Sequence, residues 1–210
     1  MSEEPKKILV AIPTGQTLFS EFALALRLLR IPPDYQVAFA MAKKANADIA
    51  RNSAAEITTD EVDYIFYLDD DILVPDNALE KLLSHGKDIV SGLYFRNNYP
   101  FLPMLYKKQS DRYEAVIDYE KNKLIEVDAC GTGCTLIKAE VFKKLDKPYF
   151  KNNEADGGFS EDLYFCKKAK EAGFTIHCDT SINCAHMSSG PIDNRTWDNV
   201  KERVKKEREK

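Results

Sequence analysis

Strand-like and helix-like segments alternate over the first half of the chain, and this alternation restricts the possible folds strongly. Short apolar or β-branched segments occur at residues 7–13, 35–41, 63–68 and 88–95, and segments of helical spacing separate them. A strand followed by a helix and then by another strand usually forms a parallel βαβ unit. The sequence therefore predicts an α/β fold, Rossmann-like, with a mostly parallel central sheet flanked by helices on both faces.

The expected helices follow from apolar spacing and from residues that stop a helix. Residues 21–30 repeat Leu and Ala at helical spacing, with Ser20 as the expected N-cap, until Pro32 and Pro33 prevent continuation. Further helices are expected at residues 46–58, 75–83, 140–144 and 161–172, the last capped by Ser160 and stopped by Gly173.

The second half of the chain has a different pattern. Short extended segments at residues 103–107, 114–119 and 124–127 are separated by charged turns, which predicts a small mixed or antiparallel region. Two more strands are expected at 134–138 and 174–178. Residues 151–158 are polar and contain glycine, as a mobile loop or lid would.

Composition excludes several classes of protein. With 34 acids against 30 bases, the net charge of -4 gives no general attraction to nucleic acid. We expect no export and no integral membrane segment, because the polar N-terminus does not resemble a signal peptide and no apolar run approaches the roughly 20 residues of a membrane span. Five scattered cysteines favour reduced thiols and a cytoplasmic setting.

The last residues, 194–210, are rich in charge. Residues 201–210 hold six bases and three acids in alternation, which predicts a solvated or frayed terminal helix. Peripheral contact with a membrane or a partner is the alternative.

Three adjacent acids, Asp69, Asp70 and Asp71, directly follow the apolar segment 63–68. Like charges this close raise one another's pKa unless a cation offsets them. Alternate residues of an extended chain share a face, so Asp69 and Asp71 can converge on one Mg²⁺ or Mn²⁺ ion. The alternative is a solvated strand end, with Asp76 capping the next helix.

Other polar residues are candidates for a site, each with a structural alternative. Glu161 and Asp162 can supply a general base or merely stabilise a helix N-terminus. His186 can bind a metal such as Mn²⁺ or be structural. Arg51 can pair with a diphosphate or form a surface salt bridge. Gly131 and Gly133 can admit a ligand or mark a strand bulge.

A structural zinc site formed by cysteines and His177 is a weaker alternative. The cysteines lack the paired spacing of a zinc ribbon, with Cys130 and Cys134 forming one group and Cys178 and Cys184 the other.

The order of these segments resembles the GT-A glycosyltransferases, especially the family-2 type, over roughly residues 7–187. The motifs that carry the resemblance are ILVAIPTG, IARNSAA, YIFYLDDDILVPDNALEKLL, DACGTGCTLIKAEVF, GGFSEDLYFCKKAKEAGF and CAHM. The resemblance implies a GT-A fold and a metal-dependent enzyme that moves a sugar from a nucleotide-sugar donor to a glycan or other hydroxyl acceptor, with inversion.

The resemblance also implies roles for individual residues. In the Asp-x-Asp motif Asp71 would bind Mn²⁺ or Mg²⁺, Asp69 would face the ion or the ribose, and His186 would complete the metal shell. Asp162 would act as the base and Glu161 would orient it or bind the acceptor. The remaining donor-binding residues implied by the resemblance are Pro13, Thr14, Gly15, Gln16, Arg51 and Asp70.

We expect one transferase domain over residues 1–193, with a nucleotide-binding half at about 7–95, an acceptor-side half at about 96–193 and a separate tail at 194–210. A UDP-sugar is the expected donor. A sugar-phosphate nucleotidyltransferase is one alternative function, although the segment after residue 13 lacks the basic residue of a phosphate loop. A non-catalytic domain that binds nucleotide-sugars or glycans is another.

Overall fold

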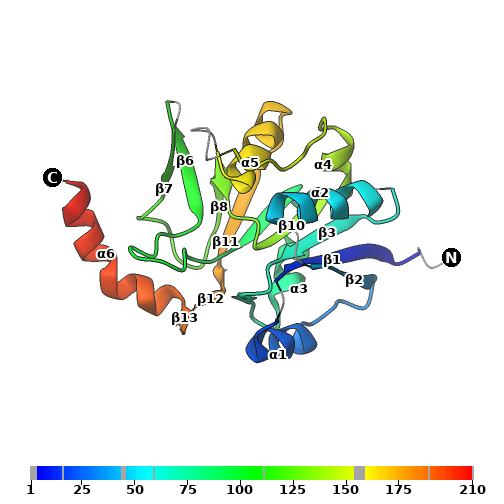
Figure 1. Ribbon diagram of the computed structural model, residues 1–210, viewed down its shortest axis with the longest axis horizontal. Helices are drawn as coiled ribbons and strands as arrows, with labels where there is room; N and C mark the ends of the chain where they lie inside the picture. Colours follow the sequence, from blue (N-terminus) through cyan, green and yellow to red (C-terminus); the bar gives the residue numbers. More distant parts are fainter. Residues whose placement is uncertain are drawn as a thin grey trace.

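The computed structural model describes residues 4–15, 17–43, 46–58, 60–110, 112–153, 159–188 and 190–209. A seven-stranded sheet runs through the molecule in the order β2-β1-β3-β10-β5-β11-β8 (Figure 1). Its strands are β1 (Lys6–Thr14), β2 (Tyr35–Lys43), β3 (Tyr64–Leu68), β5 (Ile89–Leu93), β8 (Leu124–Val127), β10 (Cys134–Lys138) and β11 (Ile176–Asn183).

The direction of the strands confirms the predicted α/β class with a mostly parallel sheet. β1 is parallel to both β2 and β3, and β11 is parallel to β5. β10 is inserted between β3 and β5 and runs antiparallel to both, while β8 closes one edge antiparallel to β11. The insertion of a late strand into the middle of the sheet brings residues near 133 beside the end of β3.

Helices cover both faces of this sheet, because successive side chains of each strand point to opposite faces. Leu9 and Ala11 of β1 join one core cluster, and Ile8, Val10 and Ile12 join the other. In Figure 1, α2, α4 and α5 lie above the sheet, and α1 and α3 lie below it. The helices are α1 (Ser20–Leu28), α2 (Ala47–Thr58), α3 (Ala78–Ser84), α4 (Ala139–Lys143), α5 (Glu161–Glu171) and α6 (Asn194–Arg208).

Two small three-stranded sheets complete the fold. One joins a segment just after β3 to segments near the C-terminus, and the other forms a hairpin beside α5. Their strands are β4 (Ile72–Leu73), β12 (Ala185–Met187) and β13 (Pro191–Ile192) in the first sheet, and β6 (Leu105–Gln109), β7 (Arg112–Ala115) and β9 (Ala129–Cys130) in the second. The antiparallel pairing of β6 with β7 and β9 confirms the mixed second half, although β7 begins and ends earlier than the strand expected at 114–119.

The predicted helix caps are only partly correct. Phe19, and not Ser20, is the N-cap residue of α1, and the Ser20 hydroxyl donates to the neighbouring Glu21 carboxylate at 2.9 Å. Ser160 is the N-cap residue of α5, but its side chain makes no capping hydrogen bond. Gly173 follows α5 with a φ of 90°, a left-handed conformation that favours glycine, and it ends the helix as predicted.

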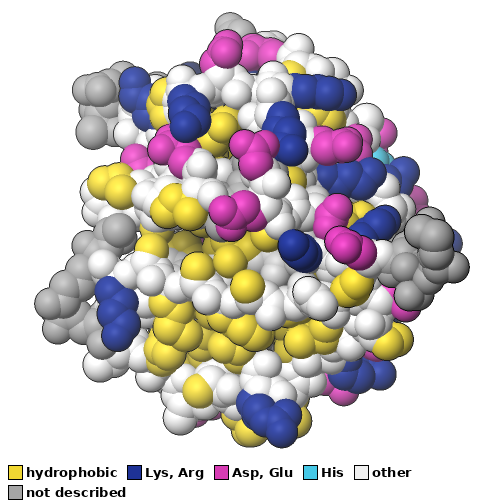
Figure 2. All heavy atoms as spheres, turned by 90° about the vertical axis from the view of Figure 1, so that its right-hand side faces the viewer, with side chains coloured by type: hydrophobic (Ala, Val, Ile, Leu, Met, Phe, Trp, Pro, Cys, Tyr) yellow, Lys and Arg dark blue, Asp and Glu magenta, His cyan; other side chains and the backbone are white. Residues whose placement is uncertain are grey.

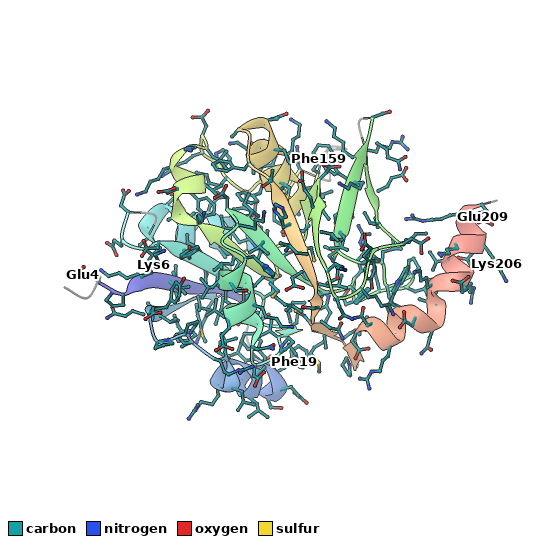
Figure 3. The ribbon with its side chains drawn as sticks, turned by 180° about the vertical axis from the view of Figure 1, so that it is seen from behind. Glu4, Lys6, Phe19, Phe159, Lys206 and Glu209 are labelled. Carbon is teal, nitrogen blue, oxygen red and sulfur yellow. The ribbon has the colours of Figure 1, made fainter. Side chains whose placement is uncertain are left out.

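The predicted C-terminal helix is present and exposed over most of its surface, but it is neither frayed nor a separate tail. Asp193 caps α6 in a capping box with Thr196. Trp197 is completely buried and stacks on Phe95 with ring centroids 6.2 Å apart, and Val204 is also buried. The opposite side of α6 is charged, and Figure 3 shows Lys206 and Glu209 at its outer end. α6 is therefore an amphipathic helix that packs on the domain through one apolar stripe.

Within the described ranges, none of the helices combines the length and the apolar character needed to cross a membrane.

Candidate active site

The loops that follow β1 and β3 meet at the carboxyl end of the sheet. The Asp70 carboxylate accepts a hydrogen bond from the backbone N–H of Gly15 at 3.0 Å, which ties the two loops together. A cleft of about 230 Å³ opens between them. Its lining consists of Pro13, Thr14, Gly15, Ala47, Asp69, Asp70 and Asp71. Most residues that the sequence assigned to a donor therefore share one cleft, whereas Gln16 lies outside the described residues.

Arg51 of α2 lies beneath this cleft and bridges two acidic segments. Its Nη2 atom lies 2.9 Å from both carboxylate oxygens of Asp69, and its Nη1 atom lies 2.7 Å from Oε1 of Glu161. The Arg51 side chain is only 2% exposed. Neither sequence interpretation of Arg51 describes this arrangement, because the guanidinium is buried and its partners are carboxylates of the protein.

The acids around Arg51 are held in a poorly hydrated environment. Burial raises the pKa of Asp69 and of Asp162 above their ordinary values, and the positive charge of Arg51 opposes that rise. Burial and the nearby Asp162 likewise raise the pKa of Glu161. Desolvation always disfavours the charged form of a carboxylate, so Arg51 is the group that keeps three acids compatible with one another here.

Asp71 faces a different partner on the far side of the same loop. Its Oδ2 atom lies 3.1 Å from Nε2 of His186, while Nδ1 of His186 lies 2.7 Å from the carbonyl oxygen of Phe95. A carbonyl only accepts, so Nδ1 carries a hydrogen and Nε2 points at Asp71. Burial works to lower the pKa of His186, but Asp71 and the Phe95 carbonyl raise it overall. The pair formed by Nε2 of His186 and the Asp71 carboxylate thus favours a nearby positive charge, either a proton on Nε2 or a metal ion bound by both side chains.

Asp162 is oriented by a turn between β9 and β10 that the sequence did not connect to it. The Thr132 hydroxyl donates a hydrogen bond to Oδ1 of Asp162, and both side chains are buried. Asp162 Oδ1 also lies 3.6 Å from Nη1 of Arg51. Gly133, the next residue in the turn, accepts the backbone N–H of Asp69 on its carbonyl at 3.0 Å. One turn therefore positions both acidic segments.

The two glycines of this turn are required by protein packing. A Cβ atom on Gly131 would lie 2.0 Å from the Tyr94 hydroxyl oxygen, and one on Gly133 would lie 2.9 Å from Oδ2 of Asp69. Tyr94 in turn accepts a hydrogen bond from the N–H of Gly133 at 3.0 Å. The glycines thus let Tyr94 and Asp69 approach the turn. The sequence had suggested ligand access or a strand bulge as the reason for these glycines, and not the close packing of protein side chains.

We expect the substitution Gly131→Ala to lower the free energy of unfolding by about 1 to 3 kcal/mol, because a methyl group there must displace the buried Tyr94 ring. Chemical denaturation of the two proteins measures the difference. Gly190→Ala is the matched control, since a Cβ at Gly190 meets no atom within 4 Å. Equal stability of the Gly131 and Gly190 variants would contradict this account of the turn.

Asn52 was also missed by the sequence interpretation. Its Oδ1 accepts hydrogen bonds from the backbone N–H groups of Tyr149 and Phe150 at 2.9 and 3.0 Å, and its Nδ2 donates to the Phe150 carbonyl at 2.7 Å. Asn52 thereby fixes the chain just before the loop expected at 151–158, of which residues 154–158 lie outside the described ranges. Its place directly after Arg51 is the signal that could have identified it.

The geometry agrees with a comparison against protein families. The family model of glycosyl transferase family 2 matches residues 33–146, which is more than half of the chain. The chain belongs to glycosyl transferase family 2. It is therefore a glycosyltransferase, and the matched residues contain Arg51, the three acids after β3 and the turn that holds Thr132.

Three solved structures share the fold of this chain. A197 from STIV superimposes with a TM-score of 0.62 at 21% identity, covering 87% of this chain and 86% of that one. GalNAc-T7, solved with UDP, GalNAc and Mn²⁺, gives 0.60 at 12% identity, covering 89% of this chain and 45% of that one. S. aureus TarS 1-349 in complex with UDP gives 0.51 at 14% identity, covering 82% and 57%.

At these identities the solved structures show the fold alone, which is the GT-A fold expected from the sequence. This family 2 chain spans less than half of the GalNAc-T7 chain. No curated protein sequence matches it.

Proposed function

We propose that this glycosyltransferase uses a divalent metal ion to transfer a sugar from a nucleotide-sugar donor to a hydroxyl acceptor, with inversion at the sugar carbon. The observation that carries the proposal is the contact between Asp71 and His186 at the end of a cleft lined by the loops after β1 and β3. In open α/β sheets, ligands bind at the carboxyl ends of the strands, where these loops lie.

The residues fit a metal ion that a donor helps to bind. Among the residues that the structure describes, no group of three His, Cys, Asp or Glu side chains could hold a metal on its own. Asp71 and His186 nevertheless offer one oxygen and one nitrogen atom 3.1 Å apart, a donor set suited to Mn²⁺. Magnesium-type sites often use one or two protein ligands and complete their shell with substrate phosphates and water.

A bound metal ion would stabilise the negative charge that develops on the departing nucleoside diphosphate. The chain's own residues do the remaining work. Pro13, Thr14 and Gly15 border the cleft, where they would contact the nucleotide. Arg51 binds both carboxylate oxygens of Asp69. The Asp69 side chain therefore lines the edge of the cleft and is not free to move toward a metal ion. We propose that Arg51 positions Asp69 and Glu161 and does not itself bind the donor.

Asp162 is the proposed base that takes the proton from the acceptor hydroxyl. A general base works best when its pKa lies near the pH of the reaction, and burial moves the pKa of Asp162 in that direction. Thr132 holds the carboxylate from one side, and Arg51 holds the neighbouring Glu161. A base that activates the acceptor directly supports a single displacement, which inverts the sugar carbon.

A UDP-sugar is the proposed donor, since GalNAc-T7 and TarS with the same fold were both solved with UDP. The acceptor is proposed to approach from the side of Asp162. We also propose that residues 1–193 act as the transferase domain, with the donor bound by about 7–95 and the acceptor by about 96–193, and that α6 supports it through Trp197. The five cysteines are buried free thiols, which suits a reducing compartment such as the cytoplasm.

We expect UDP with Mn²⁺ to raise the melting temperature by several degrees, and UDP or Mn²⁺ alone to raise it much less. A ligand that binds only the folded protein, at a free concentration of about 100 times its Kd, raises the free energy of unfolding by about 2.7 kcal/mol. Asp71→Asn should remove the joint effect and lower transfer from a UDP-sugar at least about a hundredfold, because it removes a proposed metal ligand. Thermal-shift titration and a UDP-release assay measure the two outcomes.

Asp76→Asn is the matched control, because Asp76 is also an aspartate, lies exposed between β4 and α3, and forms an ion pair only with Arg30 in the described ranges. It should keep both the thermal shift and the activity. Full transfer in the presence of a strong chelator, or full activity of the Asp71→Asn variant, would overturn the metal-dependent mechanism. If a different nucleotide with Mn²⁺ raised the melting temperature, only the proposed identity of the donor would change.

A further inference from the structure

The outer surface of α1, β2 and α2 is unusually apolar. Of the large hydrophobic side chains that are exposed in the described ranges, all except Tyr99 lie on or beside these three elements. Leu24 and Leu28 of α1, Phe39 and Met41 of β2, and Ile57 of α2 are between 45% and 72% exposed. Figure 2 shows hydrophobic side chains gathered in a band across this side of the molecule. An exposed apolar surface of this kind marks an interaction site more often than it marks ordinary solvent-facing structure.

The strand at the centre of this surface is an open edge of the main sheet. All nine residues of β2 pair with β1 on one side, and β2 is the last strand in the sheet order. Its eight residues from Tyr35 to Ala42 include neither a charge nor a proline. Such an edge presents unpaired backbone groups to any strand of suitable shape.

Two other edge strands, β8 and β7, differ from β2 in the way expected of protected edges. β8, at the opposite end of the main sheet, has only four residues, and its Glu126 pairs with Lys170 of α5 at 3.6 Å. β7, at the edge of the hairpin, carries Arg112 and Glu114. Short length and charge discourage strand addition at those edges, whereas β2 has neither protection.

Both faces of β2 contribute apolar surface. Val37 packs with the cluster on the α1 side, so Phe39 and Met41, two and four residues later, lie on that same side. Ala38 and Ala40 pair with Leu9 and Ala11, which belong to the cluster on the α2 side. A groove of about 150 Å³ runs there between β2 and α2, lined in part by Ala40, Ala42 and Ile57.

We infer that β2 is a docking edge for a second copy of this chain, which adds its own β2 in antiparallel orientation about a twofold axis. The charges at the two ends of the strand favour this occupant. Asp34, which is exposed, precedes β2, and Lys43, also exposed, ends it. Antiparallel pairing centred on Phe39 brings Asp34 of each copy near Lys43 of the other, while the uncharged residues meet in the middle.

The same arrangement explains why the middle of the strand is neutral. In this twofold interface Phe39 meets its own counterpart at the axis, so a charge at position 39 would face an identical charge. The two sheets then form one continuous sheet across both copies. The residues that line the proposed donor cleft lie on other elements, and β2 reaches the cleft only at its end, where Lys43 pairs with Thr14.

Sedimentation velocity on the full chain at micromolar concentrations tests the inference, and we expect a dimer. Phe39→Lys should weaken the dimer at least about thirtyfold, because two symmetry-related lysines would meet at a buried interface centre. Gln109→Lys adds the same charge at an exposed position of β6, in the hairpin on the other side of the molecule, and should leave the dimer intact (Figure 1). Circular dichroism of each variant confirms that the monomer remains folded.

A charge exchange gives the sharpest test of the antiparallel register. Asp34→Lys and Lys43→Asp should each weaken the dimer, and the double variant should recover most of the loss, since opposite charges again meet between copies. A monomer at all concentrations, or a dimer unaffected by Phe39→Lys, would overturn the inference. So would binding of the wild-type chain to phosphatidylcholine and phosphatidylserine vesicles that Phe39→Lys abolishes, because the surface would then belong to a membrane.

Discussion

Asp162→Asn is expected to lower the rate of sugar transfer by about 10² to 10⁴-fold while leaving donor binding nearly unchanged. The rate falls because the amide cannot accept the acceptor proton, and general bases contribute factors of this size. Binding persists because asparagine has the shape of aspartate, and its oxygen can still accept the hydrogen bond from Thr132. Steady-state transfer kinetics measure the first effect, and the UDP and Mn²⁺ thermal shift measures the second.

Thr132→Val is the companion variant, because it keeps the proposed base and removes only the hydrogen bond to it. A hydrogen bond to the charged form of a carboxylate lowers its pKa, so its loss should raise the pKa of Asp162 further. The reaction needs the deprotonated base, so the acidic limb of the kcat/KM profile should move to higher pH. If the Asp162→Asn enzyme kept more than about a tenth of wild-type activity, the loss would be smaller than the usual effect of removing a general base. That result would exclude Asp162 from this role.

The acidic edge of the sheet was predictable from sequence because it depends on local pattern. An uninterrupted apolar strand that stops at Asp69 must leave its acids at the end of β3. β1 lies beside β3 in the sheet, which places the loop after β1 against those acids, but the βαβ pattern predicts a parallel sheet without selecting this neighbour. The grouping of Gly15 with Asp70 in one cleft was therefore an implication of the family resemblance, and local pattern alone does not predict it.

The remaining contacts of the site depend on the order of strands, which local pattern does not reveal. Arg51 and Glu161 are 110 residues apart, and they meet only because α2 and α5 cover the same face of the sheet. Thr132 reaches Asp162 because β10 inserts between β3 and β5, and nothing near residue 132 predicts that insertion.

The error at the C-terminus has a different origin. The charges of α6 dominated the interpretation, although Trp197, Val200 and Val204 recur at helical spacing on one side of the helix. Trp197 and Val204 are buried members of the main apolar cluster, and Val200 packs against it. Attention to that spacing would have predicted an amphipathic helix.

Arg51→Met should destabilise the protein by about 3 to 5 kcal/mol, the cost of removing one partner of a buried ion pair. Methionine fills much of the same volume, so the loss reports mainly on charge. Without the guanidinium, Asp69, Glu161 and Asp162 would share a buried space with no cation among their described partners. Denaturation in the presence of a chelator, at neutral pH, measures the effect.

The pH dependence separates this electrostatic role from simple packing. In Arg51→Met the folded-state pKa values of the three acids, already above their ordinary values, should rise further, which widens the pH window in which the folded protein binds more protons than the unfolded chain. Stability in that window then falls as pH rises, and acidification from neutral pH should recover part of the loss. Arg30→Met removes the ion pairs with Asp76 and Glu80, in which the arginine is 52% exposed, and should cost no more than about 1 kcal/mol. A loss at Arg51 that is the same at neutral and at acidic pH would instead assign this residue a packing role only.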